Sequence, residues 1–153
     1  MSDTAAEQPV QAEAWVDGAS RGNPGEAGFG LLFRTGDQSV EICGFLGHAT
    51  NNVAEYAGLV AALSLANKEQ LDQLTVYSDS QLLVRQIQGR YKVKAPHLVP
   101  MFLKALKLRQ QIPKFSIRHV PREENREADQ LANLAIDQRA PLPDWLDLEV
   151  PEK

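Results

Sequence analysis

Hydrophobic and polar residues alternate along three early segments of the chain, and this period of two is typical of half-buried strands. The segments cover residues 12–19, 28–34 and 39–46, and Gly36-Asp37 between the last two indicates a hairpin turn. Before them, residues 1–11 are mostly small or polar and include Pro9. We therefore predict a flexible N-terminal arm over residues 1–11, followed by three strands joined by short turns.

The rest of the chain favours helices that alternate with strands. Thr50, Asn51 and Asn52 are helix-capping types, and apolar residues from Val53 to Ala66 recur behind them at helical spacing. The later pattern predicts a buried strand over residues 74–78, a helix over 80–88, a helix from Pro96 to about residue 111, a strand over 114–120 and a helix over 123–138. This order indicates the α/β class, with a mixed sheet that begins antiparallel and gains parallel strands through helical crossovers.

Length and composition limit the class of protein. The 153 residues, 43% hydrophobic and 24% charged, suit one globular domain, which we place at residues 12–138. Cys43 is the only cysteine, which excludes an internal disulfide. The longest uncharged apolar stretch, residues 56–67, is shorter than the ~20 residues of a membrane span, and the first residues are acidic rather than basic. We expect a monomeric, cytoplasmic protein without a membrane segment.

Basic and acidic residues occupy different parts of the sequence, although the net charge is only −4. Residues 80–122 contain ten Lys and Arg and no Asp or Glu, whereas the segments on either side are acidic. Such a block indicates either a surface that faces a polyanion or solvated helices whose counter-charges lie elsewhere. Lys92 and Lys94, within this block, are candidate substrate-binding residues.

Four carboxylates lie within, or at the ends of, predicted strands and helices. Asp17 interrupts the first strand, where a carboxylate is costly unless it is paired or binds a metal. Asp79 ends the fourth strand, Glu55 lies in the first turn of a helix and Asp129 near the start of the last helix, so capping or the helix dipole would also explain these three. Together, oxygen ligands from several elements at one end of a sheet suit Mg²⁺, and two such ions can promote phosphodiester hydrolysis. The sequence carries no zinc or P-loop motif.

Four ordered motifs contain these carboxylates. They are DGASRGNPG at residues 17–25, TNNVAE at 50–55, YSDSQ at 77–81 and REENREADQLA at 122–132. Together they strongly resemble the motifs of type 1 ribonuclease H, and the resemblance extends over residues 12–138.

The resemblance implies a ribonuclease H-like fold, in which helices flank a five-stranded mixed sheet. It implies hydrolysis of the RNA strand of an RNA/DNA hybrid, leaving 5′-phosphate and 3′-hydroxyl ends. Asp17, Glu55, Asp79 and Asp129 would be the catalytic carboxylates and hold two Mg²⁺ ions, with Mn²⁺ as an alternative metal. By motif position, substrate-binding side chains would be Asn23, Asn52 and Gln81 in the minor groove of the hybrid, and Thr50 and Asn51 at a DNA phosphate. A helix N-terminus favours a phosphate, and amides can bond the 2′-hydroxyl of RNA.

The sequence departs from some members of the family in two places. Their long basic protrusion after the third motif is reduced here to residues 90–94, so we expect weaker and more salt-sensitive binding of the hybrid. Members with an auxiliary catalytic histidine carry it on a longer loop before the last aspartate. His119 is a candidate for this role but also fits a strand end, and Arg122 is the alternative occupant of the loop. We expect His48 and His97 to be structural.

Two other functions stay open at this point. One is a nuclease of the same fold that prefers double-stranded RNA, which the missing protrusion allows. The other is a non-catalytic module that binds hybrids, although such a module has no need of four clustered carboxylates. The sequence indicates no protein partner.

The C-terminal tail, residues 139–153, is rich in proline and acidic residues, yet it contains Trp145, Leu146, Leu148 and Val150. A disordered terminus usually carries fewer large apolar side chains. We hypothesise that the tail docks on the domain as a stabilising extension without a catalytic role. The alternative is a flexible acidic tail that recruits a partner.

Overall fold

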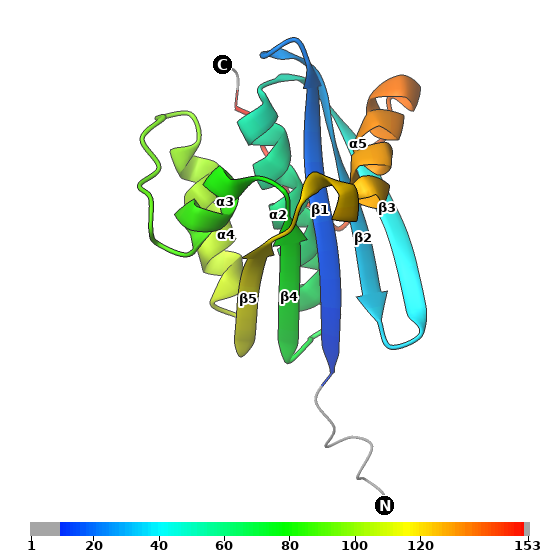
Figure 1. The fold of residues 1–153 in the computed structure, drawn as a ribbon, viewed down its shortest axis with the longest axis vertical. Coiled ribbons are helices and arrows are strands. Elements are labelled where there is room, and N and C mark those ends of the chain that lie inside the picture. Colours follow the sequence, from blue (N-terminus) through cyan, green and yellow to red (C-terminus); the bar gives the residue numbers. More distant parts are fainter. Residues whose placement is uncertain (1–9, 152–153) are drawn as a thin grey trace, which may run out of the picture.

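A computed structural model describes residues 10–151, in which three consecutive strands precede alternating helices and strands (Figure 1). The strands are β1 (Gln11–Arg21), β2 (Gly25–Thr35), β3 (Gln38–Ala49), β4 (Gln73–Ser78) and β5 (Lys114–His119). The helices are α2 (Asn51–Lys68), α3 (Gln81–Ile87), α4 (Val99–Arg109) and α5 (Arg126–Gln138), and a 3₁₀ turn, η1 (Arg122–Glu124), precedes α5. The predicted order of elements is confirmed.

The five strands form one mixed sheet in the order β3-β2-β1-β4-β5. Neighbours among β1, β2 and β3 are antiparallel, whereas β4 is parallel to β1 and to β5. The predicted five-stranded mixed sheet is therefore confirmed, and with it the ribonuclease H fold. Because β1 and β4 run in the same direction, with Val16 beside Ser78, the residues that follow these two positions emerge at the same edge of the sheet.

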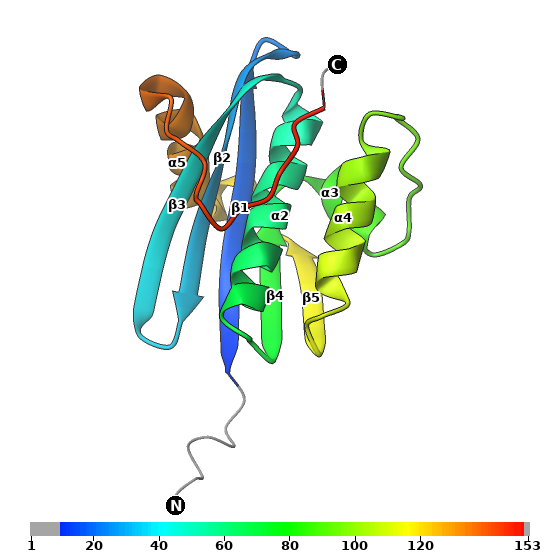
Figure 2. The ribbon, with the colours of Figure 1, turned by 180° about the vertical axis from the view of Figure 1, so that it is seen from behind.

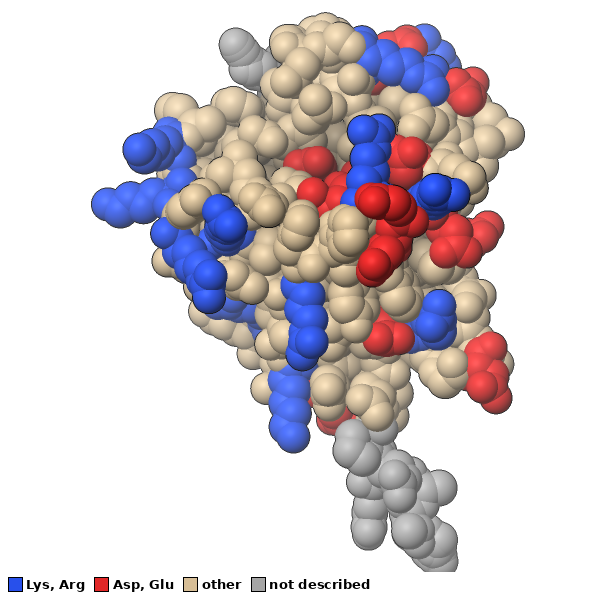
Figure 3. Space-filling model, in the orientation of Figure 1, with Lys and Arg blue, Asp and Glu red and all other residues tan. Residues whose placement is uncertain are grey.

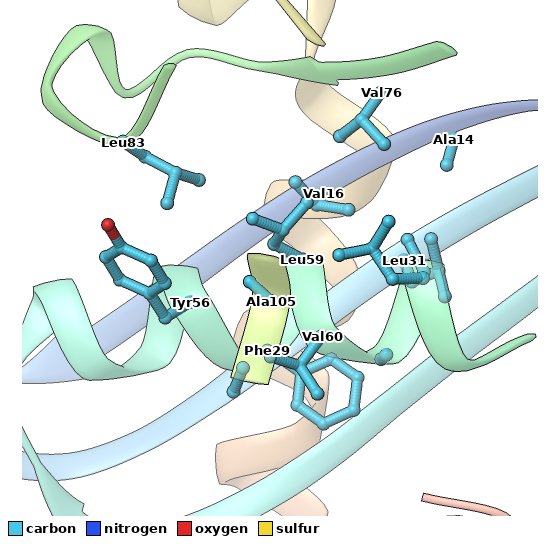
Figure 4. Close-up of a cluster of buried hydrophobic side chains, with 14 of the residues drawn as sticks. Ala14, Val16, Phe29, Leu31, Tyr56, Leu59, Val60, Val76, Leu83 and Ala105 are labelled. Carbon is cyan, nitrogen blue, oxygen red and sulfur yellow. The ribbon is translucent and has the colours of Figure 1, made fainter. Parts of the chain in front are cut away.

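Helices cover both faces of the sheet. In Figures 1 and 2, α2 and α4 lie on one face, and α5 lies on the other face over β1, β2 and β3. This double cover explains why β2 is buried almost throughout its length instead of alternating. Under α2, Val16, Leu31 and Leu59 point toward one another at the centre of the core (Figure 4).

Several element boundaries differ from the prediction; β2 begins at Gly25 and β3 ends at Ala49, each three residues outside the predicted range. Gln11 is the first residue of β1 instead of the last residue of the arm, and residues 1–9 of the predicted arm lie outside the described residues. The helix expected from Pro96 begins at Val99, because residues 95–98 form a turn in which the Leu98 amide donates to the Ala95 carbonyl. The helix expected over residues 123–138 is interrupted at Asn125, where η1 ends and α5 begins.

The C-terminal segment, residues 140–151, follows the edge of β3 and then crosses the outer side of α2 (Figure 2, red). Its first residue is bonded to β3, since the Phe45 amide donates to the Ala140 carbonyl at 2.8 Å. Leu146 is buried, Trp145 is partly buried against the core, and Asp147 forms an ion pair with Lys104 at 3.2 Å. The segment therefore covers part of α2 that would otherwise face solvent. No helix in residues 10–151 is long and apolar enough to cross a membrane.

Candidate active site

Three carboxylates from three elements meet at the edge of the sheet where β1 and β4 emerge. Asp17 lies within β1, Asp79 directly follows β4, and Glu55 comes from α2. One oxygen of each lies within 4.8 Å of an oxygen of the other two. We call Asp17, Glu55 and Asp79 the carboxylate cluster. In the described part of the chain, Asp129 is not a member of this cluster.

Gly18 brings α2 close enough for Glu55 to reach Asp17. A Cβ atom at position 18 would lie 2.3 Å from the carbonyl carbon of Ala54 and 2.4 Å from the amide nitrogen of Glu55. Backbone therefore packs directly on backbone at this point. Glu55 is the fifth residue of α2, so it lies in the second turn and not in the first turn as predicted. The effect of the helix dipole is strongest in the first turn, so it explains the position of Glu55 less well than membership of the carboxylate cluster does.

Gly30 allows a similar close approach on the other face of the sheet. It pairs with Asp17 in the β1–β2 ladder, and a Cβ atom there would lie 2.2 Å from the Ala128 carbonyl oxygen. The first turns of α5 thus pack on the backbone of β2 beside Asp17. Asp129 follows Ala128 and is half-buried at the margin of the carboxylate cluster. Its negative charge is close enough to raise the pKa values of both Asp17 and Asp79.

Burial and like charges disfavour ionisation of the carboxylate cluster. Burial, together with the adjacent Asp79 carboxylate, raises the pKa of Asp17 to about 8, although the Gly18 amide donates to its Oδ1 at 2.9 Å. Burial raises the pKa of Glu55 to about 7, against the opposing effect of a hydrogen bond from Ser80. Three carboxylates held this close need a compensating cation to be fully ionised. Their hard oxygen donors suit Mg²⁺ or Mn²⁺ better than a soft metal.

Asn125 is a buried polar residue at the site that the sequence-based prediction missed. Its side chain is only 1% exposed, and its Nδ2 donates to the Val16 carbonyl at 2.9 Å. Burial raises the pKa of Asp79, and a hydrogen bond from Asn125 opposes that rise. The Asn125 Oδ1 has no hydrogen-bond partner within residues 10–151. This side chain therefore links the start of α5 to β1 and to Asp79, and its position within the fourth motif was the available signal.

Two basic residues, Arg122 and His119, lie beside the carboxylate cluster. His119 is the last residue of β5, where it pairs with Ser78 and is exposed. The charges of Arg122 and, more weakly, of His119 lower the pKa of Asp79. Arg122 also borders a hollow of about 410 Å³ that Asp129 and Arg126 help to line. Both candidates for an auxiliary basic group are thus near the site.

The side chains expected to bind substrate surround the start of α2 and α3. The Thr50 Oγ1 accepts from the Val53 amide at 3.2 Å, and the Asn23 Oδ1 accepts from the Asn51 amide at 3.0 Å. The backbone N–H groups of Asn51 and Val53 are therefore used in capping. The backbone N–H of Asn52 and the side chains of Thr50 and Asn51 are left to bind a phosphate. Gln81 is exposed in the first turn of α3.

The two histidines expected to be structural lie close to this region. His48, at the end of β3, is exposed, and His97, between α3 and α4, is half-buried. Both line a cavity of about 390 Å³ that also contacts Pro24, Thr50 and Pro151. The cavity therefore joins residues from four separate parts of the chain.

Lys92 and Lys94 are exposed in the segment that joins α3 to α4. Figure 3 shows Lys and Arg gathered on that side of the molecule, whereas Asp and Glu gather at the centre and over α5. Lys92 and Lys94 thus belong to a basic surface next to the site, whereas Arg122, at the end of the basic block, lies at the site itself.

Several known proteins are similar to this chain in fold and in sequence. A family model described as reverse transcriptase-like matches residues 15–135. The N-terminal RNase H domain of Rv2228c from Mycobacterium tuberculosis is 42% identical, and the match covers 85% of this chain and 96% of that chain with a TM-score of 0.81. RNase H1 from Halobacterium salinarum is 42% identical, with 84% and 98% covered and a TM-score of 0.79. LC11-RNase H1, solved in complex with an RNA/DNA hybrid, is 38% identical, with 83% and 97% covered and a TM-score of 0.78.

The curated relatives differ in length from this chain. The full mycobacterial protein, a bifunctional protein, is 45% identical over 128 residues, and this chain spans 35% of its length. The chain spans 63% of the Halobacterium salinarum ribonuclease HI. The family model nevertheless matches most of β1, the other four strands, α2 to most of α5 and the carboxylate cluster, and the matches cover almost all of each solved domain. The chain belongs to the ribonuclease H family.

Proposed function

We propose that this protein hydrolyses the RNA strand of RNA/DNA hybrids in a reaction that requires Mg²⁺ and leaves 5′-phosphate and 3′-hydroxyl ends. The observation that carries the proposal is the carboxylate cluster, whose oxygens converge within 4.8 Å at the edge of a ribonuclease H sheet. The similar LC11 enzyme, solved with a hybrid, supports the choice of substrate.

Asp17, Glu55 and Asp79 would hold the metal ions, and Asp129 would complete the set from α5. Two bound Mg²⁺ ions would activate the attacking water and stabilise the departing 3′-oxygen of the RNA. The raised pKa values of Asp17 and Glu55 mean that protons compete with metal at these side chains. Mn²⁺ has similar ligand preferences and is expected to replace Mg²⁺.

The chain's polar side chains would orient the hybrid over the cluster. Asn23, Asn52 and Gln81 would bond base edges and 2′-hydroxyls in the minor groove, which distinguishes RNA from DNA. Thr50 and Asn51 would contact a DNA phosphate, and Lys92 and Lys94 would contact the backbone electrostatically.

An auxiliary basic group would act next to the scissile phosphate. We place Arg122 ahead of His119 in this role, because Arg122 has the stronger effect on the pKa of Asp79 and shares a hollow with Asp129. A guanidinium stabilises charge on a phosphate but does not exchange a proton near neutral pH.

The test uses labelled RNA/DNA, RNA/RNA and DNA/DNA duplexes of one sequence, each incubated with Mg²⁺ or with a chelator. The expected result is cleavage of the RNA strand of the hybrid alone, lost on chelation, with 5′-phosphate ends in the products. Preferential cleavage of RNA/RNA would favour the double-stranded RNA nuclease, and binding of the hybrid without cleavage would favour a binding module. Cleavage of DNA/DNA, or cleavage that persists after chelation, would overturn the proposal.

A further inference from the structure

Asp129 is restrained by a neighbour one helical turn further along α5. The Asn133 Nδ2 donates to the backbone carbonyl of Asp129 at 3.0 Å and lies 3.5 Å from its carboxylate Oδ1. Asn133 is half-buried, as Asp129 is. Residues four apart on a helix lie on the same face, so this contact follows directly from their spacing.

Arg21 determines which way the Asn133 amide faces. The Arg21 Nη2 lies 3.2 Å from the Asn133 Oδ1 and 3.4 Å from the Asn133 carbonyl oxygen. An arginine side chain has only donors, so the amide oxygen must face Arg21 and the amide NH₂ must face Asp129. Arg21 is held in turn by Asp137, at 2.7 Å from its Nη1.

These contacts join the two elements that carry Asp17 and Asp129. Arg21 is the last residue of β1, and Asn133 and Asp137 lie on α5. Asn125, directly before α5, links the start of that helix to β1 through its hydrogen bond to the Val16 carbonyl. Asp129 is therefore bracketed, with one link from α5 to β1 before it and one after it.

We infer that Asn133 is a positioning residue for Asp129 and that Arg21 orients it for this task. The inference rests on the proposed function, in which Asp129 contributes to the metal site. Asp129 lies outside the carboxylate cluster, so its side chain needs a restraint that the cluster does not supply. A neutral amide provides this restraint without cancelling the negative charge, whereas direct pairing with Arg21 would compete with a metal ion.

The test measures metal binding and kinetics for Asn133→Ala, Arg21→Ala and the double variant. Mn²⁺ binding to the protein without substrate is followed by electron paramagnetic resonance, and kcat and KM are measured with the hybrid. We expect each single variant to bind Mn²⁺ and to turn over about tenfold less well, as is usual when a partner of a metal ligand is removed. KM for the hybrid should change less than about twofold, and the double variant should be no worse than either single variant, because both act through one contact.

Arg139→Gln provides the matched control. It breaks an exposed ion pair between the end of α5 and Glu26 of β2 and a contact with the Phe45 ring, and it lies ten residues after Asp129 in the chain. Arg21→Lys, which keeps a donor and a positive charge, should recover part of the loss. If Asn133→Ala binds Mn²⁺ as tightly as Arg139→Gln and keeps its kcat, the inference is overturned. The proposed function fails separately, if the unaltered protein does not cleave the hybrid.

Discussion

The carboxylate cluster is fixed by regular elements of the fold, whereas the basic segment between α3 and α4 is an exposed connection. Asp17 lies on β1, Glu55 lies on the long helix α2 and Asp79 directly follows β4, and Asp17 is only 7% exposed. Lys92 and Lys94 are exposed in a segment without regular secondary structure. Metal chemistry requires fixed distances between ligands, whereas attraction to a phosphate backbone requires only nearby charge. The difference indicates that reaction and affinity can be disrupted independently.

The largest expected effect is on the reaction. Asp17→Asn and Asp79→Asn should each lower Mg²⁺-dependent cleavage by about 10³-fold or more, because each removes a charged metal ligand. Near-ultraviolet circular dichroism should show an intact fold, and thermal stability without metal should be equal or higher, since repulsion within the cluster falls. Glu41→Gln, an exposed carboxylate on β3, is the control and should keep full activity. A variant of Asp17 or Asp79 with near-normal turnover would remove that residue from the site.

The next effect is on stability, at the segment that crosses α2. Truncation after Arg139 removes buried Leu146 and partly buried Trp145, Leu148 and Val150, and should cost about 3–5 kcal/mol. For a domain of this size the melting temperature should fall by roughly 10 °C, with near-normal cleavage at low temperature. Asp147→Ala removes only the exposed ion pair with Lys104 and should cost less than about 1 kcal/mol. An unchanged melting temperature after truncation would favour a tail that serves a partner instead of the fold.

A smaller effect follows from the protons held by the cluster. Because folding raises the pKa of Asp17 from 3.8 to about 8 and that of Glu55 to about 7, the metal-free folded protein binds more protons than the unfolded chain between these values. The contribution of these two groups to the stability of the folded protein should therefore be greatest below about pH 4. It should be lost as the pH rises through 7 and 8. The slope is about 1.4 kcal/mol per pH unit for one proton. Denaturant unfolding at pH 6 and pH 8.5 measures it, and Asp17→Asn or saturating Mg²⁺ should flatten it.

The smallest effect is on affinity. Replacing Lys92 and Lys94 together with Ala should weaken hybrid binding by about 1 kcal/mol at low salt, for every sequence tested. The slope of log K against log salt should fall by about 1–2, while kcat at saturating hybrid stays unchanged. Lys68→Ala, an exposed lysine at the end of α2, is the matched control. An unchanged salt slope would show that Lys92 and Lys94 are merely solvated.

Local patterns predicted the fold well, because most of its elements have local causes. The turn at Gly36-Asp37 and the Thr50 cap depend on neighbouring residues, and both are present. The break at Asn125 could not be predicted from periodicity, because the buried Asn125 side chain is bonded to the Val16 carbonyl, 109 residues away. An asparagine before a helix usually indicates a cap, and nothing nearby in the sequence distinguishes a buried tie from a cap.

The candidate site was predictable only in part, because some of its features depend on contacts between distant parts of the chain. The motifs identified the carboxylates, but they did not indicate that Asp129 stands apart from the other three. That separation depends on how deeply α5 settles on β2 at Gly30, which is a contact between elements nearly 100 residues apart in the chain. The role of Asn133 was likewise hidden, because Asn133 lies outside the four motifs and its partner Arg21 is 112 residues away in the chain.

The backbone contacts at Gly18 and Gly30 have a consequence for how this sequence can change over generations. Where side chains separate two elements, each exchange of Leu for Met or Ile shifts the spacing between those elements slightly. At these two positions no side chain intervenes, so the offsets of α2 and α5 from β1 and β2 are set by the backbone itself. Residues deeper in the core, such as Leu59 and Leu31, can therefore be exchanged for other apolar residues without moving the carboxylates. Preservation of the carboxylate geometry therefore depends on the absence of a Cβ atom at these two glycines more than on the composition of the core.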